Sequence, residues 1–167
     1  MAEFPVNPNR LDPYKGTNFL VYFGPSTTPV PGIRQVSGLR WDTQVISYRE
    51  GGAANLYVLA PGSTTFEPVV LTRGRTQDAS FEEWAALVWN MQPGSVALNE
   101  MRKEVRIALL NEAHQIVMAF VLHRCWPIRY EALGPLDAMD TAIALESITL
   151  QYEGFSRDTS VAEPKQP

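Results

Sequence analysis

The side chains best suited to chemistry are few in this sequence and lie far apart. His114 and His123 are nine residues apart, one in a predicted turn and one on a predicted strand, which is not the spacing of a metal pair. Glu112, close to His114, is more simply explained as an acidic turn residue. Cys125 is the single cysteine and can form no internal disulfide. It lies in an apolar run, so we expect a buried thiol rather than a nucleophile.

Motifs for phosphate, calcium and serine chemistry are also incomplete. The Arg-Gly-Arg segment at 73–75 and the Arg-Glu-Gly-Gly segment at 49–52 could cradle a phosphate, but neither belongs to a glycine-rich phosphate loop. Asp137 and Asp140 lack the further oxygen ligands of a calcium loop. Ser63 lacks the surroundings of a nucleophile elbow. We therefore expect no enzyme activity, no catalytic, cofactor-binding or metal-binding residues, and no cofactor.

The overall composition fits one folded domain with a real core. The chain has 167 residues, of which 45% are hydrophobic and 19% charged. A formal net charge of −4 argues weakly against nucleic acid as the main partner. The N-terminus has no secretory pattern, and the longest apolar run, Ile116–Leu122, is too short to span a membrane. We expect a soluble protein made in the cytoplasm, without a membrane anchor.

Hydrophobic periodicity predicts a chain of strands with one helix. Ser80 and Glu83 form a capping-box pattern at the start of that helix, and Pro93-Gly94 should end it. Pro68 makes its strand a candidate edge strand. In chain order we predict an extended arm at 1–15, strands at 17–23, 33–49 and 65–72, the helix at 80–91, strands at 103–109, 115–126 and 143–153, and a disordered polar tail at 156–167.

The long strand predicted at 33–49 changes its apolar face along its length. Leu39, Trp41, Thr43 and Val45 alternate with the polar residues Arg40, Asp42 and Gln44, and then Ile46 and Tyr48 follow in the polar register. A bulge, or a change of environment near Val45–Ile46, would explain the switch. Residues 50–65 are predicted as a loop interrupted by a brief apolar run. The tail beyond Gly154 is polar and without periodicity.

The sum of these elements is a mainly β fold, an antiparallel β-barrel or sandwich with one flanking α-helix over residues 16–155. Trp126-Pro127 interrupts one strand, which continues at 128–132 after a bend. The four tryptophans, Trp41, Trp84, Trp89 and Trp126, could line a ligand pocket, but their helical and strand spacing favours packing.

The order and spacing of several short motifs resemble a known family. The motifs are DPYKGTNFLVYF at 12–23, VSGL at 36–39, VISYREGG at 45–52, RGR at 73–75, the aromatic helix at 80–91, RKEVRIALLNEAHQIV at 102–117, CWPIRYE at 125–131 and IALESITLQYEGF at 143–155. This succession resembles the inner tail-tube protein family of contractile-tailed phages and of phage-tail-like contractile injection systems. The resemblance covers residues 12 to 155.

The resemblance implies a structural role without catalysis. Members of this family form a small β-barrel with a flanking helix, and six copies close into a ring. Stacked rings make a rigid tube that a contracting sheath drives through a target envelope. The implied partners are further copies of the chain, the sheath protein, baseplate or spike and terminator proteins, and effector protein or DNA cargo in the lumen. The implied location is a phage tail or an injection particle.

The same resemblance suggests roles for particular residues. The projecting loop Tyr48, Arg49, Glu50, Gly51 and Gly52 would contact an adjacent subunit or the next ring, and its glycines would permit a tight backbone of positive φ. The candidate lumen face is Arg40, Asp42 and Gln44. The expected packing residues are Phe81, Trp84 and Val88 on the helix and Trp126, Pro127 and Tyr130 at the strand bend. The alternative function is a small β-barrel that binds a ligand or cofactor through its tryptophans.

Overall fold

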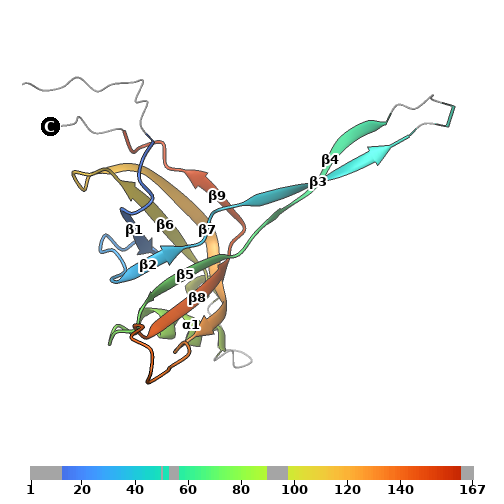
Figure 1. The fold of residues 1–167 in the computed structure, drawn as a ribbon. Coiled ribbons are helices and arrows are strands. Elements are labelled where there is room, and N and C mark those ends of the chain that lie inside the picture. The colour runs from blue at the N-terminus through green and yellow to red at the C-terminus, as the bar shows by residue number, and fades with distance from the viewer. Residues whose placement is uncertain (1–12, 50, 53–56, 90–97, 163–167) are drawn as a thin grey trace, which may run out of the picture.

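The computed structural model describes residues 13–49, 51–52, 57–89 and 98–162 (Figure 1). The sequence predictions for residues 1–12, for Glu50 and for Pro93-Gly94 therefore lie outside the described residues. The strands are β1 (Phe19–Phe23), β2 (Ile33–Val36), β3 (Trp41–Tyr48), β4 (Val58–Phe66), β5 (Val69–Gly74), β6 (Lys103–Leu110), β7 (Ile116–Glu131), β8 (Leu145–Gln151) and β9 (Gly154–Arg157). The helices are α1 (Ser80–Trp89) and the single turn α2 (Leu98–Met101).

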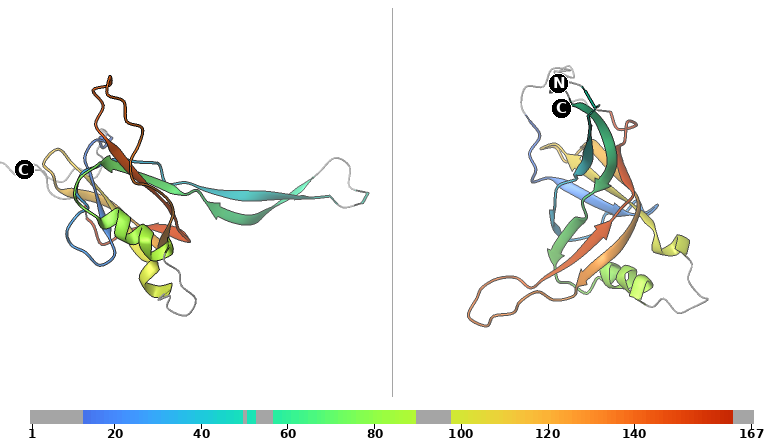
Figure 2. Two further views of the ribbon diagram at one scale, coloured as in Figure 1. Left: turned by 90° about the horizontal axis from the view of Figure 1, so that it is seen from below. Right: turned by 90° about the vertical axis from the view of Figure 1, so that its right-hand side faces the viewer.

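Seven of the strands form one antiparallel sheet that curls around a core (Figures 1 and 2). The order is β1-β6-β7-β8-β5-β2, and β9 pairs with β7 beside this path. Strands β1 and β2 are the two ends of that order, and the Val30 amide just before β2 donates to the Val21 carbonyl in β1 at 2.7 Å. The predicted class, a mainly β antiparallel fold with a flanking helix, is confirmed.

The core lies between the curled sheet and α1. Its buried members are Val21, Val69, Leu71, Phe81, Trp84, Val105, Leu122, Cys125, Ile148, Leu150 and Tyr152. Phe81 and Trp84 come from α1, and most of the others come from alternate positions of the strands, as a sheet with one buried face requires. Strand β5 shows the pattern most simply, since Val69, Leu71 and Arg73 point inward.

Helix α1 covers one opening of the curled sheet and packs mainly against β7 (Figure 2). Phe81 and Trp84 are fully inaccessible to solvent, and the Trp84 indole Nε1 donates to the Met101 carbonyl at 2.8 Å. Val88, one turn later on the same side, is half-buried. The structure thus places all three predicted helix residues toward the barrel. The predicted capping box does not form: the Glu83 amide, which would donate to the Ser80 hydroxyl, donates to the Ala79 carbonyl at 2.8 Å, and the Ser80 hydroxyl donates to Asp78.

Strand β7 exchanges partners along its 16 residues, and a bulge marks the exchange. Lys103 pairs with Cys125 but Val105 pairs with Leu122, so β7 carries an extra residue there. Arg124 lies within that stretch at a φ of 54°, in the left-handed region. Up to Cys125 β7 pairs with β6 and β9, and from Trp126 onward it pairs with β8. The strand thus continues without a break through Trp126-Pro127, where a bend was predicted. Pairing irregularities lie on both sides: the bulge before Cys125 and a register shift between Pro127 and Arg129.

The long strand predicted at 33–49 is wrong in one respect: it is two strands in different sheets. β2 pairs with β5, whereas β3 pairs only with β4 in a separate two-stranded sheet. The predicted loop at 50–65 is likewise corrected, because Val58–Phe66 forms β4. Pro61 and Gly62 made a strand look unfavourable in the sequence, because both residues are uncommon inside strands. In the structure they lie at a bulge, where the pairing is irregular.

Two further boundaries differ from the sequence prediction. Pro68 precedes β5 rather than lying within it, so β5 is a central strand between β2 and β8 and not an edge. At the C-terminus, Gly154–Arg157 pairs with β7 as β9. Residues 156 and 157 are therefore a strand, which corrects the expectation that a disordered tail begins at residue 156. Val161 also packs against a small buried cluster around Ala108 and Ala119.

Candidate assembly surface

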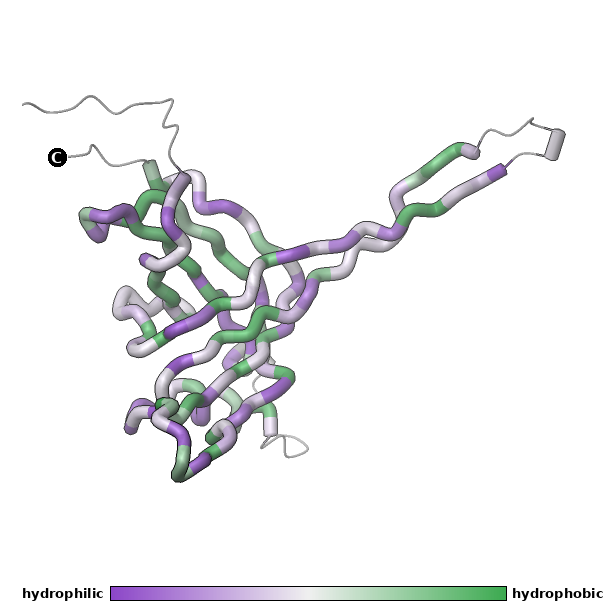
Figure 3. Tube along the Cα trace, viewed as in Figure 1, coloured by the Kyte–Doolittle hydropathy of each residue, from purple (hydrophilic) through white to green (hydrophobic). Residues whose placement is uncertain are grey.

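The β3–β4 hairpin leaves the barrel as a long arm (Figure 1). All eight residues of β3 are solvent-exposed, as are seven of the nine residues of β4. The arm nevertheless carries large apolar side chains, and Figure 3 shows hydrophobic residues along its outer part. They are Val45, Ile46, Tyr48, Tyr57, Val58 and Leu59, each between 49% and 66% exposed. Contiguous exposed apolar surface of this kind marks an interaction site in proteins.

The base of the hairpin is held to the barrel by aromatic contacts. Trp41 and Phe66 are paired across the hairpin, and their rings lie 5.2 Å and 6.1 Å from the ring of Phe155 in β9. The Phe66 ring also lies 5.7 Å from that of Tyr152. Beyond this base, the described part of the hairpin extends away from the barrel (Figure 2).

The predicted projecting loop lies at the far end of this arm. Tyr48 ends β3, and the Arg49 guanidinium lies over the Tyr57 ring at 5.9 Å from its centroid. Gly51 and Gly52 form a turn. Gly52 has a φ of 102°, a backbone conformation that residues with a Cβ atom rarely adopt. Glu50 lies outside the described residues. The positive φ expected of the glycines therefore belongs to Gly52, and the loop's contact with a neighbour stays a prediction.

The three residues predicted to face a lumen lie on one side of the inner part of the hairpin. Arg40 forms an ion pair with Glu67 at 3.2 Å, Asp42 is paired with Thr65 across the strands, and Gln44 accepts from the Ser63 hydroxyl at 3.4 Å. All three are exposed. Their polar neighbours make this side suitable for contact with water, and whether it lines a channel stays a prediction.

The barrel body exposes a second set of large apolar side chains, at a distance from the hairpin. One group borders an open groove of about 600 Å³ between α1 and β7. Its exposed members are Trp89, at 89%, and Ile128, at 52%. The other group lies on the segment between β7 and β8, where Leu133, Leu136, Met139 and Ile143 are between 49% and 93% exposed.

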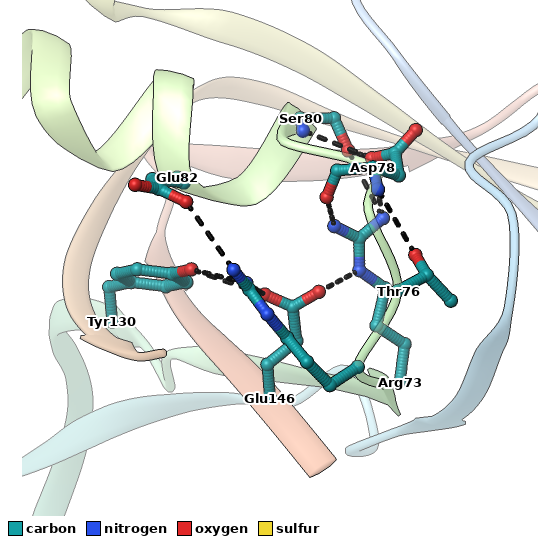
Figure 4. A network of polar contacts seen from close by, with 8 residues as sticks. Arg73, Thr76, Asp78, Ser80, Glu82, Tyr130 and Glu146 are labelled. Carbon is teal, nitrogen blue, oxygen red and sulfur yellow. Dashed lines mark hydrogen bonds and ion pairs between the residues drawn. The ribbon is translucent and has the colours of Figure 1, made fainter. Parts of the chain in front are cut away.

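A buried ionic network fixes the start of α1 against the sheet (Figure 4). Arg73 in β5 and Glu146 in β8 are both inaccessible to solvent, and the Arg73 Nε donates to Glu146 Oε1 at 2.6 Å. The Arg73 Nη1 and Nη2 atoms reach the Asp78 carboxylate and carbonyl at 2.8 and 2.7 Å. Arg75 donates to the other oxygen of Glu146 at 2.6 Å. The network thus links β5, β8 and the residues that lead into α1.

The network also explains why the pKa values of several of its members are shifted. The pKa of Asp78 is lowered to about 2, because its carboxylate accepts hydrogen bonds from Ser80 and from Arg73. Burial raises the pKa of Tyr130, whose hydroxyl donates to Glu146 at 3.1 Å. The pKa of Arg75 is raised by its hydrogen bond to Glu146. Sequence reasoning noted Arg73 and Arg75 but missed Glu146 and Asp78, since Glu146 lies 73 residues from Arg73.

The residues of the predicted strand bend have separate environments. Pro127 is buried, and Trp126 is half-buried beneath Arg102, whose guanidinium lies 5.3 Å from the ring centroid. Tyr130 belongs to the ionic network. The four tryptophans do not surround one cavity, because Trp84 is buried in the core while Trp41 and Trp89 are exposed on different elements.

The residues with reactive side chains remain dispersed in the structure. Cys125 is buried in the core, and burial raises the pKa of its thiol to about 12. His123 contacts Ser156 at 2.8 Å and Glu104 at 3.5 Å, whereas His114 occupies a turn at a φ of 58°. Among the described residues, no three histidine, cysteine or acidic side chains gather as metal ligands would. In the same part of the chain, no helix is long and apolar enough to cross a bilayer.

Comparison with known proteins gives a family match over most of the chain. The profile of the family described as T4-like virus tail tube protein gp19 matches residues 15–156. A comparison with curated proteins found no match.

Comparison with solved structures gives chains of the same fold. A chain of the anti-feeding prophage cap, a tube terminating cap, has a TM-score of 0.74 at 24% identity, covering 95% of this chain and 99% of that one. A chain of the anti-feeding prophage baseplate has a TM-score of 0.71 at 23% identity, covering 88% and 96%. A chain of the sheath-tube complex of the extracellular contractile injection system PVC has a TM-score of 0.71 at 23% identity, covering 87% and 91%.

Proposed function

The chain belongs to the T4-like virus tail tube protein family, and from this membership we propose that it is a structural subunit of the inner tube of a contractile tail or contractile injection system. Six copies close into a ring, rings stack into a tube, and contraction of a surrounding sheath drives the tube through a target envelope. The chain acts by assembling and performs no catalysis.

The observation that carries this proposal is the exposed apolar arm formed by β3 and β4. A two-stranded hairpin is at best marginally stable on its own in water. Here the large apolar side chains of the described outer part are exposed, and the aromatic contacts that hold the hairpin to its own barrel lie at its base, around Trp41 and Phe66. Such an arm is stabilised when neighbouring subunits cover it, and in a closed assembly every arm is covered in the same way.

The rest of the molecule supports a role in assembly. The barrel interior is filled by side chains, including Trp84, Phe81 and Tyr152, which leaves the core to packing rather than to a ligand. The exposed apolar groups on α1, β7 and the segment after β7 give further surface for contacts. The buried network of Arg73, Asp78 and Glu146 holds α1 rigidly on the sheet, as a subunit of a stiff tube requires.

The partners in this proposal are those of a tube inside a particle. They are further copies of this chain, the sheath protein, baseplate or spike proteins and a terminator, with effector protein or DNA as cargo. Solved chains of similar fold come from a sheath-tube complex, a baseplate and a tube terminating cap, which supports this set. The chain is made in the cytoplasm and becomes part of a phage tail or an injection particle.

The experiment that tests the proposal is negative-stain electron microscopy of the purified full-length protein at high concentration, with its mass measured by light scattering. We expect sixfold rings or stacked tubes. A protein that stays a monomer or dimer contradicts self-assembly, and a small molecule bound to that species supports the alternative ligand-binding barrel. Replacing Arg49, Glu50, Gly51 and Gly52 then tests the loop, and we expect rings that no longer stack.

A further inference from the structure

Residues 154–161 contact both faces of the barrel sheet, and this segment is defined here as the strap. Its first part is β9, whose register pairs Phe155 with Leu122 and Ser156 with Val121 of β7. Leu122 is a core residue, and successive residues of a strand point to opposite faces. Phe155 therefore lies on the core side of the sheet, and Ser156 lies on its outer side.

On the core side, β9 passes the base of the β3–β4 hairpin (Figure 1). The Phe155 ring lies 5.2 Å from the ring of Trp41 and 6.1 Å from that of Phe66, the two residues paired across the hairpin base. The same ring lies 6.1 Å from that of Tyr152 and 6.3 Å from that of Phe120 in the barrel. Phe155 thus contacts two rings of the hairpin and two rings of the barrel.

On the outer side, the strap covers a small apolar patch of the sheet. Leu20, Ala108 and Ala119 are paired in one row across β1, β6 and β7. Ile107 packs against the core, so the next residue, Ala108, points away from the core. Both alanines are nevertheless inaccessible to solvent. Val161 packs on this patch, where the small alanine side chains leave room for it.

Asp158 fixes the strap between these two contacts. Its backbone amide donates to the Ala119 carbonyl at 2.8 Å, and its carboxylate accepts from the Arg106 guanidinium at 3.3 Å. The other carboxylate oxygen accepts from the Ser160 amide at 3.0 Å and from the Ser160 hydroxyl at 2.5 Å. These bonds close the turn at 159–160 that precedes Val161.

We propose that the strap sets the direction of the β3–β4 hairpin, because docking of Val161 and Asp158 on the outer face holds Phe155 against the hairpin base on the core side. The element with two states is β9, which is either docked along β7 or released from it. Among the described residues β9 pairs with β7 alone, and a short strand with one partner opens at a lower free energy than a central strand. The contacts of Asp158 and Val161 therefore decide how often β9 opens. This coupling acts within a single chain and does not depend on the proposed assembly.

Two hydrogen bonds make the base of the hairpin a pivot. The Glu67 amide donates to the Arg40 carbonyl at 3.1 Å and so closes the hairpin at its base. The Gln151 side chain donates to the Phe66 carbonyl at 3.1 Å and so ties the base to the end of β8. Both bonds lie outside the strap, so they remain when β9 is released. The hairpin would then stay attached to the barrel but turn about its base, because the Phe155 ring no longer holds it.

A matched pair of aspartate substitutions tests the outer contact. Val161→Asp places a charge against the apolar patch, whereas Ala162→Asp places the same charge one residue later, at an exposed position. Burying a charge without a partner is costly, so we expect Val161→Asp to speed hydrogen exchange of the β9 amides by about tenfold or more. Ala162→Asp should exchange like the wild type. The amides of the central strands β5 and β8 should keep their wild-type rates in both variants.

The direction of the hairpin is measured with two spin labels on the full chain. One label is attached at Ser47→Cys in β3 and the other at Arg129→Cys in β7, both exposed positions. The native Cys125 stays unlabelled, since burial raises the pKa of its thiol to about 12. In unassembled protein, verified by light scattering, we expect one narrow distribution of label distances in the wild type and in Ala162→Asp. Val161→Asp should broaden that distribution.

Phe155→Ala is the positive control, because it removes the ring at the hairpin base directly, and it should broaden the distribution in the same way. A narrow distribution in Phe155→Ala contradicts the role of that ring. If β9 in Val161→Asp exchanges at the wild-type rate, the outer contact does not hold β9 and the proposal is wrong. If β9 exchanges faster while the label distances stay narrow, the hairpin does not depend on the strap and the proposal is also wrong.

Two further outcomes separate the patch from general effects of the substitution. Equal effects of Val161→Asp and Ala162→Asp would assign the change to charge alone and contradict the role of the patch. A Val161→Asp protein that melts well below the wild type is replaced by Val161→Ser, which removes the apolar group without adding charge. The same increase in β9 exchange and in the spread of label distances is then expected.

Discussion

Two glutamates, each placed between two arginines, should differ in how much they contribute to stability, because one is buried and the other is exposed. Glu146 bridges Arg73 and Arg75, and Glu153 bridges Arg102 and Arg124. The Glu146 side chain is fully buried, whereas the Glu153 side chain is 44% exposed. Removing one partner of a buried ion pair leaves an uncompensated charge in the interior, and removing one partner of a surface pair leaves a solvated charge.

We predict that Glu146→Gln lowers the free energy of unfolding by about 3–5 kcal/mol, because the buried Arg73 loses its main counter-charge. The matched variant Glu153→Gln should cost about 0–1 kcal/mol. Urea denaturation of the two variants under conditions that keep the chain unassembled provides the comparison. Equal losses from the two substitutions would show that the Arg73 network contributes no more than a surface pair.

The lowered pKa of Asp78 predicts an acid-sensitive contribution to stability. The folded pKa of about 2 lies below the ordinary value of 3.8, so the Asp78 carboxylate stabilises the fold fully above about pH 4. This contribution is lost as the pH falls from about 4 through 2. In Asp78→Asn it is absent throughout, so the variant should lose less stability than the wild type over that interval. Melting temperatures measured between pH 6 and pH 2 check this, and parallel curves for the two proteins would contradict it.

At the scale of the element, the bulge in β7 allows one strand to serve two parts of the sheet. The extra residue between Leu122 and Cys125 turns the strand from its pairing with β6 and β9 to its pairing with β8. Arg124 takes the left-handed conformation that the turn requires. A residue with a Cβ atom is strained there, and a β-branched residue is strained most.

We predict that Arg124→Gly changes the free energy of unfolding by no more than about 0.5 kcal/mol, since relief of backbone strain offsets loss of the Glu153 ion pair. Arg124→Val should lower it by about 1–2 kcal/mol, because it loses the same ion pair and adds strain. Denaturant titrations of both variants, run side by side, measure the difference. Valine tolerated as well as glycine would mean that the bulge does not hold position 124 in the left-handed region.

The elements that sequence predicted well are those whose signal is local. An apolar run located β1, alternation located β6 and helical spacing located α1. The switch of apolar register in Trp41–Tyr48 suggested either a bulge or a change of environment, and the structure has a bulge in the hairpin whose extra residue lies on β4. Strand β4 was missed because Pro61 and Gly62 are ordinarily breakers, and only the pairing with β3 shows that they sit at that bulge.

The parts of the site that sequence did not predict depend on distant partners. Nothing local to Glu146 indicates that Arg73, 73 residues earlier, is its counter-charge. The partition of 33–49 into two sheets is equally non-local, because it depends on β5 and β4 pairing with different halves of that segment. The loop at 48–52 was located by resemblance to a family, and its contact with a neighbour remains a prediction.

At the scale of the whole molecule, the barrel and the hairpin are structurally separable. The barrel sheet and the β3–β4 sheet share no strand pairing among the described residues, and they meet at the aromatic cluster of Trp41, Phe66 and Phe155. The core residues all come from the barrel and α1. Folding of the barrel should therefore be independent of the outer hairpin.

We predict that replacing residues 43–64 with an Asn-Gly turn, which joins the paired residues Asp42 and Thr65, leaves a folded barrel that no longer assembles. The melting temperature should stay within a few degrees of that of the unassembled wild type, because no core contact is removed. Circular dichroism reports folding and light scattering reports assembly. Tubes formed by the shortened chain would exclude the hairpin as the main assembly element.

The separate register of β3 and β4 also means that the hairpin's length can change without disturbing the barrel. Each strand residue adds about 3.3 Å of reach, and side chains return to the same face every second residue. Adding two residues to each strand would therefore carry the apolar faces about 7 Å farther out in their original orientation, whereas adding one to each would exchange them. In the proposed tube, hairpin length would therefore set how far the arm reaches toward a neighbouring subunit, and it could change only in steps of two residues without exchanging the faces.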